Sequence, residues 1–148
     1  MVSKTRIKKA AELLVANELL RLGCDVFVPL VDTGIDIICL VNHKPMLIQV
    51  KESKCFPDGT YWQKINKEEL QKYCAENMFY IFVLRARTRV DYLVLPSTFI
   101  SENLDKLNVD SKGQIHFFFE VKNWRVIDKR KDGLDLSKFL DNFSYFKP

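Results

Sequence analysis

A carboxylate, an amide and an ammonium group near the start of the chain could form a site for phosphoryl chemistry: Asp36, Gln49 and Lys51. Carboxylate and amide oxygens can hold a hard divalent cation such as Mg²⁺, which keeps several of its waters and binds a substrate phosphate. The Lys51 ammonium group would then polarise the attacking water or offset the charge that develops on the phosphate. These residue types predict metal-assisted hydrolysis of a phosphate ester, provided that the fold brings them onto one patch.

A β-hairpin is the element expected to bring these groups together. Two apolar runs are separated by residues 42–45, which have turn chemistry. We expect Val41 and Met46 to face each other across this turn. Counting outward, Asp36 then faces Lys51, and the amide group lies diagonally on the same strand face. The neighbouring strand residues are apolar on both faces, which predicts a sheet covered by helices, with the polar groups at one strand end.

A helix expected over residues 5–22 offers a further carboxylate, because its apolar residues recur at helical spacing. Both Glu12 and Glu18 lie in this segment, and spacing alone does not choose between them. Glu12 could instead be a surface residue that pairs with Lys8 and Lys9.

The remaining sequence predicts a mixed sheet flanked by helices. Asn66, with Glu69 three residues later, forms a capping box for one helix, and Ser97 can cap another. Residues 52–64 contain Pro, Asp and Gly and are expected to form a loop. The order α-β-β-β-α-β-β-α-β-α is typical of an α/β domain. Further strands are expected at residues 24–29, 79–86, 92–95 and 115–120, and further helices at 66–77, 97–107 and around Leu136, Phe139, Leu140 and Phe143.

The order of these motifs resembles the PD-(D/E)XK nuclease superfamily over roughly the first third of the chain. A helix containing Glu12 precedes Asp36, and a hairpin leads to the sequence Gln49-Val50-Lys51. The resemblance implies a restriction-endonuclease-like α/β fold with a mixed central sheet flanked by helices. It also implies that the four polar residues are catalytic, with Glu12, Asp36 and Gln49 binding the metal. Gln49 stands where the superfamily usually has Asp or Glu, which should weaken metal binding.

The Gln-x-Lys variant, followed by the strand sequence Tyr-Leu-Val-Leu-Pro-Ser at residues 92–97, is similar to the homing endonucleases encoded by group I introns. This subgroup implies a site-specific endonuclease that makes Mg²⁺-dependent double-strand breaks in DNA, with Mn²⁺ able to substitute. It also suggests a homo-oligomer, either a dimer or a tetramer built as a pair of dimers, because cutting both strands takes two centres. Archaeal Holliday junction resolvases resemble the first third almost as well, although they normally keep an acid at the position of Gln49.

Two alternatives to a homing endonuclease stay open. Within the enzymes, the alternative is a Holliday junction resolvase or a restriction-type nuclease. In another class, the chain would be an inactive module that only binds nucleic acid because Gln49 replaced an acid.

A second match to the same spacing begins at Asp110 and continues with Glu120-Val121-Lys122. No helix with a suitable carboxylate precedes it, and the neighbours of Asp110 have turn chemistry. We therefore interpret Glu120 and Lys122 as the polar end of a strand. His43 and His116 have no catalytic partner in the sequence and are interpreted as structural.

Two basic clusters are candidate DNA contacts, since a net charge of +4 is compatible with a polyanionic partner. The first cluster is Arg85, Arg87 and Arg89, which would project from one face of a strand if that strand continues, because they alternate at period two. The second cluster is Lys129, Arg130 and Lys131, which would lie in a loop between the last strand and the last helix.

The composition fits a single folded domain spanning residues 1–148, with 47% hydrophobic and 28% charged side chains. The longest apolar run, residues 78–84, is too short to span a membrane. Neither a signal peptide nor a zinc or disulfide framework is expected from the N-terminal sequence and the four separate cysteines. We therefore expect an intracellular, cytoplasmic protein that acts on DNA.

Overall fold

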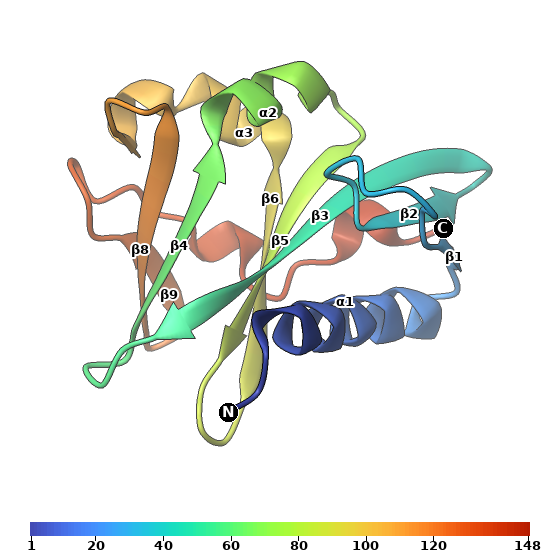
Figure 1. Cartoon of the computed structure of the whole chain (residues 1–148), viewed down its shortest axis with the longest axis horizontal. Helices are drawn as coiled ribbons and strands as arrows, with labels where there is room; N and C mark the ends of the chain where they lie inside the picture. Colours follow the sequence, from blue (N-terminus) through green and yellow to red (C-terminus); the bar gives the residue numbers. More distant parts are fainter.

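The chain forms a mixed nine-stranded sheet with helices packed around it (Figure 1). A computed structural model describes all residues, 1–148. The elements are α1 (Lys4–Arg21), β1 (Asp25–Phe27), β2 (Ile37–Val41), β3 (Lys44–Cys55), β4 (Thr60–Asn66), α2 (Lys67–Tyr73), β5 (Met78–Arg85), β6 (Val90–Pro96), α3 (Ser97–Glu102), η1 (Leu104–Lys106), β7 (Asn108–Val109), β8 (Gln114–Lys122), β9 (Arg125–Asp128), η2 (Ser137–Phe139) and η3 (Ser144–Phe146).

Strand β3 connects two halves of the sheet. Its residues 47–53 pair in parallel with β5, while its earlier residues pair with β2 in antiparallel fashion. Only Lys54 and Cys55 pair with β4, which then leaves β3 and runs along β8. The two strands therefore diverge in a fork, visible between the teal and green ribbons of Figure 1. This fork is where the polar residues of β3 lie.

Helix α1 covers one face of the β1–β2–β3–β5–β6 half. Ser3 caps the helix by accepting a hydrogen bond from the backbone N–H of Arg6 at 3.3 Å. Ala11, Val15 and Leu19 are buried in one core cluster together with residues of β2, β3, β5 and β6. Their spacing of four residues keeps them on one side of the helix. The predicted first helix is confirmed to within one residue at each end.

The β4–β8 half packs its inner face against a second core. Residues such as Tyr61, Ile65, Phe117 and Phe119 alternate along these strands and are buried there. The expected loop at residues 52–64 is wrong, because β3 continues to Cys55 and β4 begins at Thr60. The Pro-Asp-Gly turn chemistry occupies only residues 56–59, closed by a hydrogen bond from Phe56 N–H to the Thr60 carbonyl at 2.8 Å.

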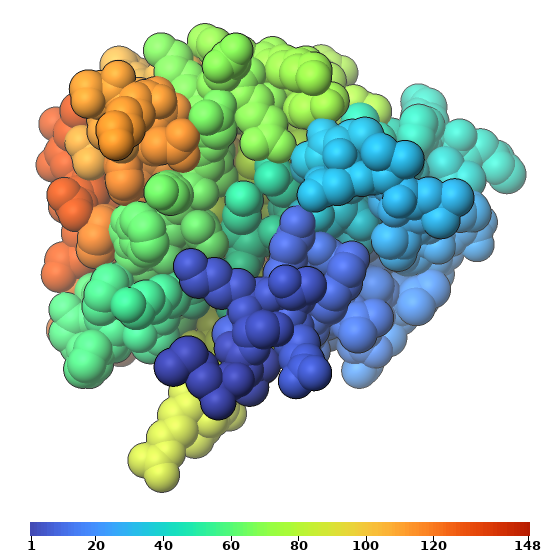
Figure 2. Space-filling model, in the orientation of Figure 1, coloured from blue at the N-terminus to red at the C-terminus, as the bar shows by residue number.

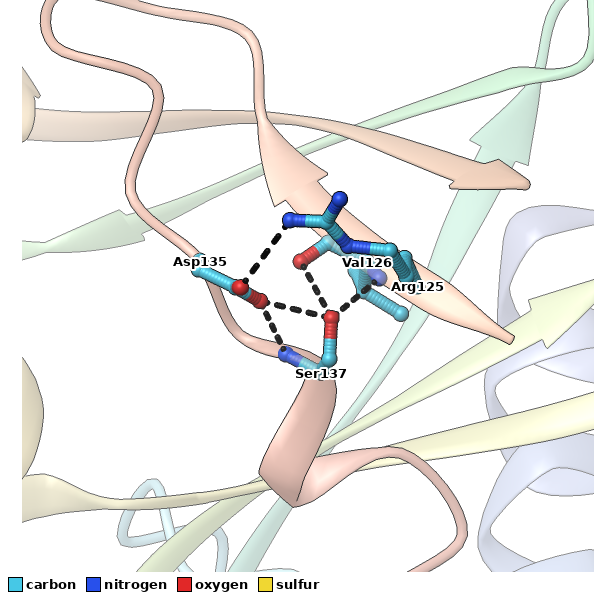
Figure 3. Close-up of polar contacts among 4 residues, drawn as sticks. All are labelled: Arg125, Val126, Asp135 and Ser137. Atoms are coloured by element: carbon cyan, nitrogen blue, oxygen red, sulfur yellow. Dashed lines mark hydrogen bonds and ion pairs between the residues drawn. The ribbon is translucent and has the colours of Figure 1, made fainter. Parts of the chain in front are cut away.

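The C-terminal segment does not form the expected amphipathic helix. It forms two short 3₁₀ turns that place Phe139 and Phe146 in the two cores. The segment is tied to β9 by Ser137, whose hydroxyl accepts from Val126 N–H at 2.9 Å and donates to Asp135 at 2.6 Å (Figure 3). Leu140 then forms a β-bridge with Leu93 of β6. The next residue, Asp141, has a positive φ of 49°. The apolar residues of this segment are therefore spaced as in a helix, but they are buried by two separate 3₁₀ turns.

Two other expectations differ in detail. The Asn66 cap is confirmed, since its side chain accepts from Glu69 N–H at 2.9 Å, but α2 ends at Tyr73 and not near residue 77. Ser97 does not cap α3; it lies inside the helix and its hydroxyl donates to the Ala75 carbonyl at 3.0 Å. The short strands β7 and β9 were not anticipated. No helix of the structure combines the length and the apolarity that a membrane crossing requires.

Candidate active site

The β2–β3 hairpin has a different register from the one expected. Its turn contains only Asn42 and His43, both with positive φ (51° and 65°), as in a tight two-residue hairpin turn. Met46 consequently pairs with Cys39 and not with Val41. The same register places Asp36 opposite Gln49, so the expected pairing of Asp36 with Lys51 is wrong. The pairing moved by two residues, which keeps every side chain on the expected strand face.

The Asp36 carboxylate is buried and held at the end of β2. Its Oδ2 accepts a hydrogen bond from the backbone N–H of Val50 at 2.8 Å. Its Oδ1 lies 3.5 Å from Nζ of Lys8, which reaches it from α1. The main chain of β3 fixes Oδ2, and Oδ1 is therefore directed at the Lys8 ammonium group.

Three of the predicted site residues line one cavity of about 320 Å³ at the strand fork: Asp36, Gln49 and Lys51. Gln49 is 7% exposed and Lys51 is half-buried. At the base of the fork, Gln63 of β4 donates from Nε2 to the Glu52 carbonyl at 2.9 Å. The predicted convergence of the three polar groups is therefore found, although the pairing that produces it differs.

Glu12, and not Glu18, is the helix carboxylate near this cavity. Glu12 is 6% exposed and lines a neighbouring cavity of about 500 Å³ together with Asp36. Its Oε2 accepts from Nζ of Lys9 at 2.7 Å, and this hydrogen bond raises the pKa of Lys9. Glu18 lines neither cavity. The pairing of Glu12 with Lys9 was foreseen, but for a surface residue and not for a buried one.

Lys8 is a site residue that sequence reasoning placed only among surface charges. It lines both cavities and a third of about 610 Å³ that extends along the fork to α2. Figure 2 shows this side of the molecule, with a hollow between the start of α1 (dark blue), the loop before β2 (light blue) and the green atoms of β4 and α2. The available signal was its position one helical turn before Glu12, on the same helix face.

The donor atoms of the site fit a hard divalent cation. The Asp36 carboxylate lines both cavities, with Glu12 in one and Gln49 in the other, and its Oδ1 lies 3.5 Å from the Lys8 ammonium group. No three side chains of His, Cys, Asp or Glu gather in one place, so a metal would depend on the amide, on main-chain oxygens and on water. The ammonium group near Asp36 shows that this position already accommodates a positive charge.

The second match to the motif spacing does not form a site. Asp110 lies in the turn between β7 and β8, and its carboxylate meets Nε2 of His116 at 2.7 Å. This hydrogen bond is the main cause that lowers the pKa of Asp110 to about 2. Glu120 lies toward the other end of β8 and pairs with Lys129 at 3.2 Å. The interpretation of Asp110 as a turn residue agrees with this geometry, and His116 likewise has a structural partner.

The three arginines of the first basic cluster do not share a strand face, because β5 ends at Arg85. Arg85 pairs with Glu52 beside the fork. Arg89 pairs with Asp91 at 2.6 Å and lies over the ring of Trp124, with 4.7 Å from its guanidinium carbon to the ring centroid. Arg87 projects from the turn between β5 and β6 and makes no ion pair.

The second basic cluster lies in the loop that follows β9. Lys129 pairs with Glu120, and Lys131 donates from Nζ to the Asp105 carbonyl at 3.0 Å. Arg130 lies over the ring of Phe118, with 4.0 Å from its guanidinium carbon to the ring centroid. Within this second cluster, only Arg130 combines exposure with an aromatic contact.

Two solved structures are similar to the chain in fold. The bacterial homing endonuclease I-Ssp6803I superposes with a TM-score of 0.67 and 16% sequence identity, over 97% of this chain and 91% of that chain. The chain shares the fold of this protein. Archaeoglobus fulgidus Hjc, a Holliday junction resolvase from an archaeal hyperthermophile, superposes with a TM-score of 0.52 and 14% identity, over 88% of this chain and 93% of that one. The expected restriction-endonuclease-like fold class is confirmed. No protein-family model and no curated protein sequence matches the chain.

Proposed function

We propose that the chain is a site-specific DNA endonuclease of the homing type, which makes double-strand breaks by hydrolysing phosphodiester bonds. The observation that carries this proposal is the cavity at the strand fork, where Asp36, Gln49 and Lys51 lie together in a fold similar to that of two nucleases. A cavity with both acidic and basic groups suits a phosphate diester, whose charge must be bound and whose attacking water must be oriented.

Asp36 and Gln49 would hold Mg²⁺, with Glu12 supporting the metal or its water, and Mn²⁺ could substitute. The bound metal would supply a Lewis acid for the phosphate and a more acidic water. The N–H of Val50 keeps the Asp36 carboxylate in place for this role. The Lys51 ammonium group would donate to the phosphate or to the attacking water, stabilising the charge that develops during attack.

Two observations favour a homing endonuclease over a junction resolvase. The homing endonuclease superposes on 97% of the chain with the larger TM-score of the two comparisons. Gln49 also agrees with the Gln-x-Lys variant of the intron-encoded group. A resolvase is the second candidate, supported by its own similarity of fold.

A homo-oligomer, either a dimer or a tetramer, follows from the proposed reaction. One chain of 148 residues offers one such cavity, and two centres related by symmetry are needed to cut both strands. Exposed apolar side chains on α1 and the loop after β1, among them Leu13, Leu20 and Leu30, are available for contacts between subunits.

The proposal is tested by incubating the purified protein with supercoiled plasmid carrying candidate targets, with linear duplex and with a synthetic four-way junction. We expect Mg²⁺ or Mn²⁺ to support linearisation of plasmid and EDTA to abolish it. Preferred cleavage of the junction would support the resolvase instead. DNA binding without nicking in either metal would contradict catalysis and support an inactive binding module.

A further inference from the structure

The outer face of β4 and β8 is not covered by any helix (Figure 1). Side chains that alternate with the buried core residues point to this face, and all of them except the buried Thr60 are half-exposed or exposed. A water-facing strand surface normally carries polar residues. Here Trp62 and Phe118 are direct cross-strand partners, and neither belongs to a core cluster. Large aromatic side chains on an uncovered face mark an interaction surface.

The aromatic rings on this face form a continuous row. Phe56 stacks on Phe118 with 6.1 Å between ring centroids and an interplanar angle of 9°. Trp62 lies 6.5 Å from Phe118 and 6.0 Å from the His116 ring. Cross-strand packing accounts for the direct Trp62–Phe118 pair and for the diagonal contact with His116, whose Nδ1 accepts from Trp62 Nε1 at 3.3 Å. Phe56 extends the row beyond the two strands, and a cavity of about 490 Å³ opens beside Phe56 and Phe118.

Cations accompany the row without acidic partners. Lys54 and Arg130 lie over the rings of Phe56 and Phe118, at 5.5 and 4.0 Å from the centroids. Lys64 is exposed on β4, and none of the three forms an ion pair, whereas the neighbouring acids Glu120 and Asp110 are already paired with Lys129 and His116. Asp58 also lines the cavity beside Phe56 and Phe118; it forms no ion pair, and its Oδ1 accepts from the Thr60 N–H and hydroxyl at 3.0 and 2.7 Å. Three unpaired cations and one unpaired carboxylate leave this face positive on balance, which suits a polyanion.

The outer face and the candidate active site meet at the strand fork. Lys54 follows Lys51 by three residues on β3, which is about 10 Å along a strand. Gln63 lines the cavity at the fork, while its neighbours Trp62 and Lys64 point to the opposite side of β4. A duplex about 20 Å wide that places a phosphate in the cavity would extend past this edge of the sheet.

We propose that the outer face of β4 and β8 binds the DNA arm that flanks the cleaved bond. Lys54, Lys64 and Arg130 contact its phosphates, and the row of Phe56, Trp62 and Phe118 packs against its sugars and bases. This inference rests on the proposed nuclease function, because DNA is taken as the partner. Contacts of this kind position the substrate and add affinity that falls as salt concentration rises.

The first test uses tryptophan fluorescence, because the chain has two tryptophans and only Trp62 lies on this face. The Trp124→Phe variant leaves Trp62 as the only tryptophan reporter. It is titrated with a mixed-sequence 30-base-pair duplex in EDTA, so that no strand is cut, while binding is followed independently by anisotropy of labelled DNA. We expect Trp62 emission to be quenched over the same DNA concentrations that raise the anisotropy. Binding without any change in Trp62 emission would overturn the inference.

The second test removes charge from the face. The triple variant Lys54→Ala, Lys64→Ala, Arg130→Ala should lower DNA affinity roughly 10- to 100-fold at about 0.1 M salt and reduce the slope of log affinity against log salt by about 2 to 3. A matched control, Arg21→Ala, Lys44→Ala, Lys147→Ala, removes three exposed and unpaired cations at the other end of the molecule (Figure 1). Circular dichroism verifies that both variants fold.

The outcomes separate this inference from the proposed function. If anisotropy detects no DNA binding by the unmodified chain or by the Trp124→Phe variant, the nuclease proposal itself fails. If both triple variants bind as the unmodified chain does, or lose affinity equally, DNA binding stands and the outer face is not its site. A change of Trp62 emission with protein concentration in the absence of DNA would assign the face to a second copy of the chain, which also overturns the inference.

Discussion

Two regions of the molecule carry similar motif spacing, and only in one of them do the side chains line one cavity. In the β2–β3 region, Asp36 and the Gln49-Val50-Lys51 sequence lie on paired strands, so their side chains meet in one cavity. In the β7–β8 region, Asp110 precedes β8 and Glu120 lies near the end of the same strand. Glu120 lies six residue steps from Gln114 along this strand, which is about 20 Å. Strand pairing, and not spacing in the sequence, decides which acids can act together.

The largest expected difference between the two regions is in cleavage. Asp36→Ala removes the carboxylate at the centre of the cavity, and we expect plasmid linearisation in Mg²⁺ to fall on the order of 10³-fold or more. Asp110→Ala is the matched control, because it removes the acid of the second region. It should keep cleavage within about threefold, while breaking the contact with His116 lowers thermal stability. Equal losses of cleavage in both variants would contradict the assignment.

Lysine replacements sharpen the same comparison. We expect Lys51→Ala to reduce the single-turnover cleavage rate about 10²- to 10³-fold, because it removes a donor to the charge that develops on the phosphate. DNA binding measured in EDTA should change little by comparison. Lys122→Ala, at the corresponding position of the second region, should cleave as the unmodified chain does. Unchanged cleavage in Lys51→Ala would disprove the role of this lysine.

Position 49 tests the metal directly. Gln49→Glu adds a third negative charge beside Asp36 and Glu12, so Mn²⁺ affinity measured by calorimetry should rise roughly tenfold. The mirror change in the second region, Glu120→Gln, should leave Mn²⁺ binding unaltered. If Gln49→Glu binds the metal no better than the unmodified chain, the amide does not face the metal.

Lys8 is expected to compete with the metal for Asp36. Replacement by Met keeps an unbranched, flexible side chain but removes the ammonium group 3.5 Å from Oδ1. Mn²⁺ affinity should therefore rise about three- to tenfold in Lys8→Met. Lys4→Met is the control, because Lys4 lines the same cavities but pairs with no acid. An equal rise in both variants would show a general charge effect.

The smallest effect on cleavage is expected from a buried acid of the β8–β9 region. Burial raises the pKa of Asp128 to about 6. Because its pKa is lower in the unfolded chain, the folded state binds the proton more tightly, and stability falls as pH rises from about 4 to about 6. The free energy of unfolding should therefore fall between pH 4 and pH 7, and in Asp128→Asn this fall should be smaller by about 2 to 3 kcal/mol, as measured by urea unfolding at both pH values. Cleavage at pH 7 should stay within about twofold, and an unchanged pH profile of stability would contradict the assignment.

Much of the site was predictable because strand faces follow a period of two. The two-residue error in the hairpin register left Asp36, Gln49 and Lys51 on one face, so the candidate site was recognised despite the wrong pairing. The choice of Glu12 over Glu18 was not predictable, since both lie on one helix and only packing against the sheet shows which is near the cavity.

The parts that escaped prediction depend on long-range contacts. Local turn chemistry at residues 56–59 gave no measure of how far the flanking strands extend, because β4 is stabilised by its pairing with β8, whose residues lie 48 to 60 positions later. The apolar residues of the C-terminal segment have helical spacing. Its turns are fixed instead by the hydrogen bond from Val126 of β9 to the Ser137 hydroxyl and by the bridge from Leu140 to Leu93 of β6. Lys8 looked like any surface lysine, because its acidic partner lies on a distant strand.

The fork between β3 and β4 is closed at its floor by side chains. Only Lys54 and Cys55 pair the two strands through the main chain, but the β4–β8 half shares one buried core with β5 and β6. Phe82 of β5 lies 5.3 Å from Phe117 and 5.1 Å from Phe119 of β8, measured between ring centroids. The two halves are thereby locked against each other, and a preorganised opening of this kind binds its ligand without first having to order itself.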